Sequence, residues 1–115
     1  MLASVVAKIE PRIDCTSGGS CGVFAAWVTK VALKHGISDF TIVFGMVQLR
    51  GEYGNWRDEH IWIEHKGKKI DPTIQQFFPY FIGYVGGKRK KFTPEEFQLK
   101  ENFKLKKSWV KHHLV

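Results

Sequence analysis

The chain has 115 residues, 43% of them hydrophobic and 14% aromatic, which suits a single domain over residues 1–115. No apolar run approaches the roughly 20 residues needed to cross a bilayer, and residues 1–10 lack the positive start of an export signal, so we expect a soluble, cytoplasmic protein with no membrane partner. The net charge of +7 comes mostly from residues 88–111, which hold nine basic and three acidic residues.

The N-terminal part predicts a loop of small residues followed by a helix. Residues 1–12 are apolar enough for a short helix or strand, and residues 15–20 form a loop in which small side chains allow unusual backbone angles. Over residues 21–35, apolar side chains recur at the three-to-four spacing of a helix. Ser20 is placed to cap this helix, and Gly36 is placed to end it.

The middle of the chain predicts two strands. Residues 40–49 are rich in branched and aromatic side chains, which favours a largely buried strand. Residues 51–56 are interpreted as a loop. Over residues 59–65, isoleucines alternate with polar residues, which predicts a half-buried strand. Its isoleucines face the core, and His60 and Trp62 share the opposite face.

Turn signals divide the rest of the chain. The Lys-Gly pair at 66–67 predicts a tight turn, and residues 68–71 return as a short strand that Pro72 ends. Residues 80–85 favour a further strand. Residues 93–96 combine a threonine at the N-cap, a proline at the first helical position and acidic residues in the first turn, which predicts at least a short helix.

The basic run Lys88, Arg89, Lys90 and Lys91 has two interpretations. Such a run is typical of a solvated turn or tail. Alternatively, the basic C-terminal segment 88–115 binds nucleic acid or an acidic protein, with bases stacked on aromatic residues that are interleaved among the charges. These aromatic residues are Phe92, Phe97, Phe103 and Trp109. They fit the apolar face of a terminal helix or strand equally well.

Cys21 is the candidate nucleophile because it is expected in the first turn of a helix. Unpaired N–H groups and the positive end of the helix dipole lower the pKa of a thiol there, and the thiolate is the reactive form. Small residues before it let a substrate carbonyl approach the sulfur, and the Cys21 N–H can contribute to an oxyanion hole. We expect Gly19, Ser20 and Trp62 to contact the substrate or its oxyanion, although Trp62 also fits a packing residue that shields the site.

His60 is the candidate base, and Asp71 is the candidate group that orients it. If residues 66–67 form the turn, His60 and Asp71 are diagonal neighbours on one face of a hairpin; if residues 65–66 form it, they are direct partners. In both cases the carboxylate orients the imidazole and stabilises its charged form. A three-residue loop would place them on opposite faces.

These residues suggest a family. Residues 18–25, Gly-Gly-Ser-Cys-Gly-Val-Phe-Ala, resemble the nucleophile turn of the transglutaminase-like and papain-like cysteine enzymes. His-Ile-Trp-Ile-Glu at 60–64, Lys-Gly-Lys at 66–68 and Ile-Asp-Pro-Thr at 70–73 resemble the His-x-Trp-x-Glu, Gly and Asp-Pro-Thr pattern of the transglutaminase-like core. The resemblance covers roughly residues 14–78. It implies an α+β fold, in which a Cys-bearing N-terminal helix packs against a small antiparallel sheet, and an acyl-thioester intermediate that water or an amine resolves.

Two positions depart from the family pattern. Gly22 follows the nucleophile, where transglutaminase-like sequences often have a bulky residue. Cys15 stands six positions before the nucleophile, where papain-like enzymes usually supply an oxyanion glutamine. A side-chain oxyanion donor is therefore unassigned. No Asp- or Asn-rich loop indicates calcium, and we expect no cofactor.

The two cysteines leave alternatives open. Two are too few for a disulfide scaffold, and they lack the CxxC spacing of a structural zinc site. A disulfide between Cys15 and Cys21 would silence the nucleophile. Cys15, Cys21, His60 and Asp71 are an alternative zinc set whose spacing matches no recognised ligand pattern, and we expect no metal.

Two hypotheses for the function follow. The first is a cysteine hydrolase or acyltransferase acting on a protein or peptide, in which Cys21 is the nucleophile, His60 the acid-base and Asp71 the orienting group. Protease or amidase activity is favoured over cross-linking because a small chain has little surface for selecting an amine acceptor. The second hypothesis is a non-catalytic binding module of the same fold that uses the basic C-terminal segment. The sequence carries no sign of the oligomeric state.

Overall fold

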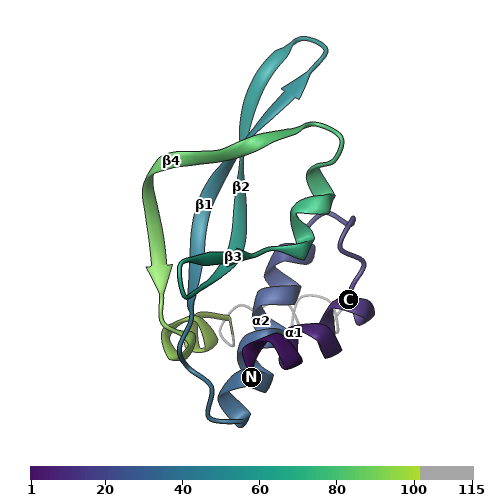
Figure 1. The fold of residues 1–115 in the computed structure, drawn as a ribbon. Helices are drawn as coiled ribbons and strands as arrows, with labels where there is room; N and C mark the ends of the chain where they lie inside the picture. Colours follow the sequence, from purple (N-terminus) through teal and green to yellow (C-terminus); the bar gives the residue numbers. More distant parts are fainter. Residues whose placement is uncertain (102–115) are drawn as a thin grey trace, which may run out of the picture.

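The computed structural model describes residues 1–101, apart from the side chain of Lys88. These residues form an α+β fold in which helices pack against an antiparallel sheet (Figure 1). The elements are α1 (Leu2–Ile9), the 3-10 helix η1 (Glu10–Arg12), α2 (Ser20–Lys34), β1 (Thr41–Gly51), β2 (Gly54–His65), β3 (Lys68–Ile70), the 3-10 helix η2 (Pro72–Phe77) and β4 (Phe81–Phe92). Within the described chain the strand order is β3-β2-β1-β4. The predicted fold class, with the Cys-bearing helix packed on a small antiparallel sheet, is confirmed.

The two long helices bury one face each. Of the two alternatives for residues 1–12 the helix is correct, and α1 buries Leu2, Val5 and Ile9. The buried side of α2 includes Phe24 and Val28, and both helices contribute to one apolar core with the sheet. The three-to-four spacing of these residues places them on one side of each helix, as an amphipathic pattern requires. Within the described residues no helix is long and apolar enough to cross a bilayer.

The start of α2 differs from the prediction by one residue. The N-cap is Gly19, whose φ of 84° lies in the left-handed region that glycine adopts without strain. Ser20, predicted as the cap, is instead the first helical residue; it is buried, and its hydroxyl lies 3.5 Å from the Cys15 carbonyl oxygen. Cys21 therefore lies in the first turn, as expected. At the other end Gly36, with a φ of 72°, ends the helix as predicted.

Strands β1 and β2 form one long hairpin. Their register runs from Thr41 opposite Glu64 to Gly51 opposite Gly54. The prediction of a loop over residues 51–56 is wrong, because the chain turns in two residues and pairing resumes at Gly54. The closed end of this hairpin projects beyond the rest of the fold (Figure 1).

The prediction that β2 is half-buried is also wrong. Ile63 belongs to the apolar core and Ile61 packs against it, as expected. However, His60 and Trp62 on the other face are 2% and 1% exposed. They are covered because aromatic rings from η2 and β4 pack on them.

Of the turns considered for the connection from β2 to β3, the one at residues 66–67 is correct. His65 pairs with Lys68, so Lys66 and Gly67 are the two turn residues. Both have positive φ, 51° and 76°, the backbone that a tight hairpin turn of this kind requires. Ile70 pairs with Ile63, and the chain therefore leaves β3 at Asp71 on the same side as His60.

The last strand is longer than predicted. The chain from 80 to 85 lies largely in β4, but the strand continues through the basic run to Phe92. Its register against β1 shifts between Phe44 and Met46, where the chain bends near Gly87, whose φ is 113°. The interpretation of residues 88–91 as a solvated turn or tail is wrong, because Lys90 and Lys91 pair with residues of β1.

The predicted helix after β4 is confirmed, since residues 94–101 are helical. Thr93 caps it: its hydroxyl accepts the Glu96 N–H at 3.2 Å, and Glu96 accepts the Thr93 N–H at 3.3 Å. Phe97 is fully buried and Phe92 packs against the core, so these two aromatic residues belong to an apolar face. Phe103 and Trp109 lie outside the described residues.

Candidate active site

Three elements deliver the candidate catalytic side chains to one place. Cys21 comes from the first turn of α2, His60 from β2, and Asp71 from the residue between β3 and η2. The thiol interacts with the imidazole, and the imidazole is hydrogen-bonded to the carboxylate. The structure thus brings together three residues that are far apart in the sequence.

The bond between His60 and Asp71 is short and buried. The imidazole Nε2 lies 2.9 Å and 2.8 Å from the two carboxylate oxygens, and the side chains are 0% and 4% exposed. Asp71 also accepts hydrogen bonds from the Tyr84 hydroxyl at 2.7 Å and the Thr73 hydroxyl at 3.2 Å. The carboxylate is held from several sides, so it fixes the imidazole with Nε2 as the protonated nitrogen.

Cys21 meets the other side of the imidazole. Because Nε2 is bonded to Asp71, Nδ1 is the nitrogen left to take the thiol proton. Burial alone would raise the pKa of Cys21, but hydrogen bonds from His60 and the Ile61 N–H, the charge of His60 and a hydrogen bond from Gln76 outweigh burial and lower it.

The pKa of His60 shifts in the complementary direction. Burial opposes its charged form, but hydrogen bonds to Asp71 and Cys21, together with the negative charges of both, raise the pKa to about 9. A lowered thiol pKa beside a raised imidazole pKa favours a thiolate–imidazolium pair near neutral pH.

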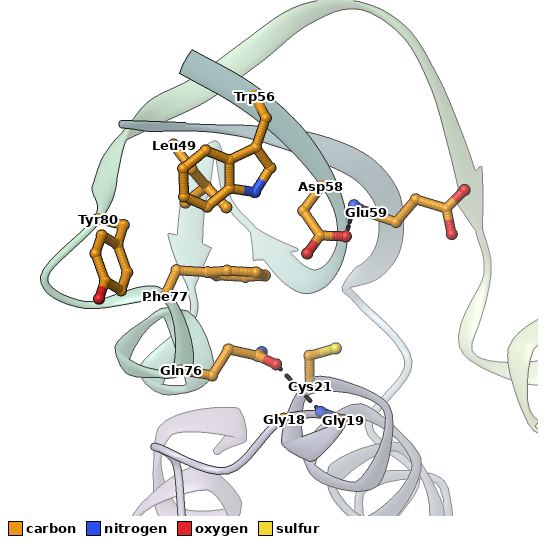
Figure 2. Close-up of a pocket in the computed structure, with 10 residues that line it drawn as sticks. All are labelled: Gly18, Gly19, Cys21, Leu49, Trp56, Asp58, Glu59, Gln76, Phe77 and Tyr80. Atoms are coloured by element: carbon orange, nitrogen blue, oxygen red, sulfur yellow. Dashed lines mark hydrogen bonds between the residues drawn. The ribbon is translucent and has the colours of Figure 1, made fainter. Parts of the chain in front are cut away.

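Gln76 is a site residue that the sequence analysis missed. Its Oε1 accepts the Gly19 N–H at 3.2 Å, as Figure 2 shows, and its Nε2 donates to the Thr73 carbonyl at 3.0 Å. The same Nε2 lies 3.4 Å from His60 Nδ1. No local pattern distinguishes it from Gln75, which instead bonds the Pro72 carbonyl; the turn of η2 decides which glutamine reaches the thiol.

The three residues that we expect to contact the substrate or its oxyanion differ in what the structure leaves accessible. Gly19 lines the space beside Cys21, but its N–H is occupied by Gln76. Ser20 is buried and is directed at Cys15. Trp62 is 1% exposed and so offers no surface to a substrate. Instead it packs 5.9 Å from the His60 ring, and its indole donates to Glu64 at 3.1 Å.

The alternatives for the cysteines are not realised. Cys15 and Cys21 are both free, which contradicts a disulfide between them. Burial, and then the nearby carboxylates of Glu10, Asp14 and Asp71, raise the pKa of Cys15, so it is a poor nucleophile. Across residues 1–101, no three His, Cys, Asp or Glu side chains are grouped so that they could hold a metal ion, so the alternative zinc set does not form a metal site among these residues.

Two pockets flank Cys21. We call the first, of about 520 Å³, the aromatic pocket (Figure 2); its lining residues are Gly18, Gly19, Cys21, Leu49, Trp56, Asp58, Glu59, Gln76, Phe77 and Tyr80. The second, of about 500 Å³, is the basic pocket; its lining residues are Cys21, Phe44, Gly45, Met46, Glu59, His60, Ile61, Lys90 and Lys100. A thiol at the junction of two pockets can reach a substrate that extends to both sides.

The basic run at 88–91 is divided between the two faces of β4, because successive side chains of a strand point to opposite faces. Arg89 and Lys91 are engaged by Glu64, at 3.3 Å and 3.2 Å. Lys90 lines the basic pocket instead. Arg89 and Lys91 therefore lie on the opposite face of β4 from Lys90, and these three side chains do not form one continuous patch.

In comparisons with known proteins, no family model, curated protein or solved structure matches the chain. The resemblance to transglutaminase-like and papain-like enzymes rests on the residue pattern alone. An inference about function must therefore come from the chemistry of the site.

Proposed function

We propose that the protein is a cysteine-nucleophile hydrolase or acyltransferase that acts on an amide or ester bond. The observation that supports this most directly is the chain of contacts from the Cys21 thiol through His60 to Asp71, with a lowered thiol pKa and a raised imidazole pKa. Shifts of pKa that are caused by specific partners, at residues that line a pocket, are typical of catalytic groups.

The first half of the reaction uses the thiolate and the imidazolium. The Cys21 sulfur attacks the carbonyl carbon, a C–S bond forms, and the π electron pair moves to the carbonyl oxygen. When this electron pair re-forms the carbonyl double bond, the bond to the leaving nitrogen or oxygen breaks, and His60 Nδ1 gives its proton to the leaving group. The products of this half are an acyl thioester and a neutral imidazole.

The second half releases the acyl group. Neutral His60 takes a proton from water or an amine as that molecule attacks the thioester carbonyl, and the C–S bond then breaks to regenerate the thiolate–imidazolium pair. We propose hydrolysis of a protein or peptide amide, and the experiment below separates hydrolysis from transfer to an amine. Two free cysteines fit a reducing compartment such as the cytoplasm.

An acyl-enzyme on Cys21 is the result that tests this function. We expect p-nitrophenyl acetate to acetylate the protein in a burst followed by slow turnover, and peptide mapping by mass spectrometry to place the acetyl group on Cys21. The Cys15→Ser protein should behave in the same way, because Cys15 is buried and its pKa is raised. Acetylation confined to lysines, with no burst, would contradict an acyl-thioester mechanism. Adding glycine ethyl ester then separates hydrolysis from transfer, since transfer would give the N-acetyl amine.

We assign the oxyanion contacts to the Cys21 N–H and the Gln76 amide. The Gln76 Nε2 is held beside the thiol by the bond that its Oε1 accepts from Gly19, so it can donate to an oxygen that becomes charged there.

Removing this donor should slow acyl transfer without removing the thiolate. We expect Gln76→Ala to reduce the acetylation rate by roughly 10²–10³-fold, because the developing oxyanion loses a preorganised hydrogen bond. Alkylation by iodoacetamide, which forms no oxyanion, should change much less. Gln76→Glu is the matched variant, since it keeps an acceptor for Gly19 but presents a negative charge to the oxyanion. An equal loss in both reactions would show that Gln76 only maintains the thiolate.

A further inference from the structure

The two pockets beside Cys21 differ in charge. The aromatic pocket is lined by the carboxylates of Asp58 and Glu59, and none of its lining residues is basic. The basic pocket has Lys90 and Lys100 among its lining residues. In a chain with a net charge of +7, an acidic pocket next to the thiol is a local departure from the overall charge.

Asp58 is the carboxylate directed into the aromatic pocket. In Figure 2 its side chain points into the space between Trp56, Phe77 and Cys21, whereas the side chain of Glu59 extends away from the rings. One oxygen of Asp58 accepts the Glu59 backbone N–H at 2.8 Å, which fixes the orientation of the carboxylate. Among the residues that the structure describes, no ion pair neutralises it.

The neighbouring basic residue does not compensate this charge. The Arg57 Nε donates to the Gln48 Oε1 at 3.2 Å, and successive side chains of a strand point to opposite faces. The Asp58 carboxylate therefore remains available to a ligand.

The exposed aromatic rings of Trp56 and Tyr80 also line the aromatic pocket (Figure 2). Trp56 and Tyr80 are 44% and 52% exposed, and their ring centroids lie 6.1 Å apart. Their faces can bind the methylene stem of a long side chain and attract a cation by its interaction with the π system. Aromatic faces combined with a fixed carboxylate suit a lysine or arginine side chain better than a neutral or acidic one.

The position of His60 indicates which half of the substrate enters this pocket. The leaving group must receive its proton from His60, which lines the basic pocket and not the aromatic pocket. The leaving half therefore extends toward the basic pocket, and the acyl half toward the aromatic pocket.

On these grounds, and resting on the proposed function, we infer that the enzyme selects substrates whose acyl half carries a lysine- or arginine-like side chain. Its apolar stem passes the ring of Phe77, and its cationic end lies next to Asp58 and the ring of Trp56 (Figure 2). Asp58 is thus a residue that determines specificity.

Peptidyl chloromethyl ketones that differ in one side chain test this inference. The Cys21 thiolate displaces chloride from such a ketone, so that a C–S bond forms as the C–Cl bond breaks. In the Cys15→Ser protein at low salt, we expect the lysine ketone to label Cys21 about ten-fold faster than the norleucine ketone, and the glutamate ketone to be slowest. The net charge of +7 favours anionic ligands overall. A faster reaction with the lysine ketone must therefore come from charges close to Cys21. Added salt should reduce the preference, because exposed charges are screened.

Matched variants give the result that would overturn the inference. Asp58→Asn should bring the ratio of lysine to norleucine rates close to one, whereas Glu95→Gln, in the helix after β4 and outside both pockets, should keep the ratio of the unmodified protein. Equal rates in the unmodified protein, or an unchanged ratio in Asp58→Asn, would show the inference to be wrong. Failure of the proposed function is distinct, because then none of the three ketones, norleucine included, would label Cys21.

Discussion

Replacing His60 with alanine is expected to reduce acyl transfer by about 10⁵–10⁶-fold. In the proposed reaction His60 takes the thiol proton and returns a proton to the leaving group, and the variant can do neither. The pKa of Cys21 should also rise, because hydrogen bonding from His60 and its charge both lower it. The rate of acyl transfer from p-nitroacetanilide, measured beside iodoacetamide alkylation of Cys21, reports both losses, because an amine leaving group needs a proton whereas p-nitrophenolate departs without one.

The stability of this variant needs a separate control. The Asp71 side chain is 4% exposed, and a buried charge that loses its partner costs about 3–5 kcal/mol, so His60→Ala is expected to unfold at lower urea concentration. His60→Gln is the matched variant, since its amide can still donate to the carboxylate but cannot transfer a proton near neutral pH. A folded His60→Gln protein that acetylates Cys21 at the original rate would contradict the role of His60.

Replacing Asp71 with asparagine is expected to reduce acyl transfer by about 10³–10⁴-fold. One carboxylate oxygen of Asp71 accepts hydrogen bonds from both His60 and Tyr84. The asparagine oxygen can take its place, so the fold should be kept while the negative charge is lost. Asp39→Asn, which changes an exposed aspartate outside both pockets, is the control. Equal activity of the two variants would show that the charge of Asp71 does not support catalysis.

The same substitution should narrow the pH range of activity from both sides. The Asp71 charge helps to raise the pKa of His60 to about 9, so without it the imidazolium loses its proton at lower pH and the alkaline limb moves down. A less charged imidazole also stabilises the thiolate less, so the pKa of Cys21 rises and the acidic limb moves up. The pH profile of the acyl-transfer rate with p-nitroacetanilide, whose amine leaving group must be protonated, measures both shifts in the two proteins. A profile that moves in one direction as a unit would contradict this coupling.

Local signals account for the parts of the fold that sequence predicted well. The helical spacing of residues in α2 and the stop at Gly36 need no tertiary information. The turn at Lys66 and Gly67 is equally local, because a glycine permits its positive φ. This turn sets the register of the hairpin, and the register places Asp71 near His60. The proximity of these two residues was therefore accessible from the sequence.

The parts that sequence missed depend on contacts between distant segments. Gln76 becomes a site residue because η2 lies beside the start of α2, where it meets Gly19. The second face of β2 is buried because Phe77 and Tyr84 pack on it from later in the chain. β4 continues past its glycines because β1 offers an edge to pair with. None of these contacts leaves a periodic pattern in the residues involved.

The pH dependence of Cys21 alkylation tests the thiolate–imidazolium pair most directly. In the Cys15→Ser protein, the rate of iodoacetamide labelling should reach half of its plateau below the pKa of about 8.5 of an ordinary thiol, because the pKa of Cys21 is lowered. In His60→Gln it should still be rising at that pH. A rate that follows an ordinary thiol in both proteins would contradict the account, since sulfur and imidazole would then titrate independently.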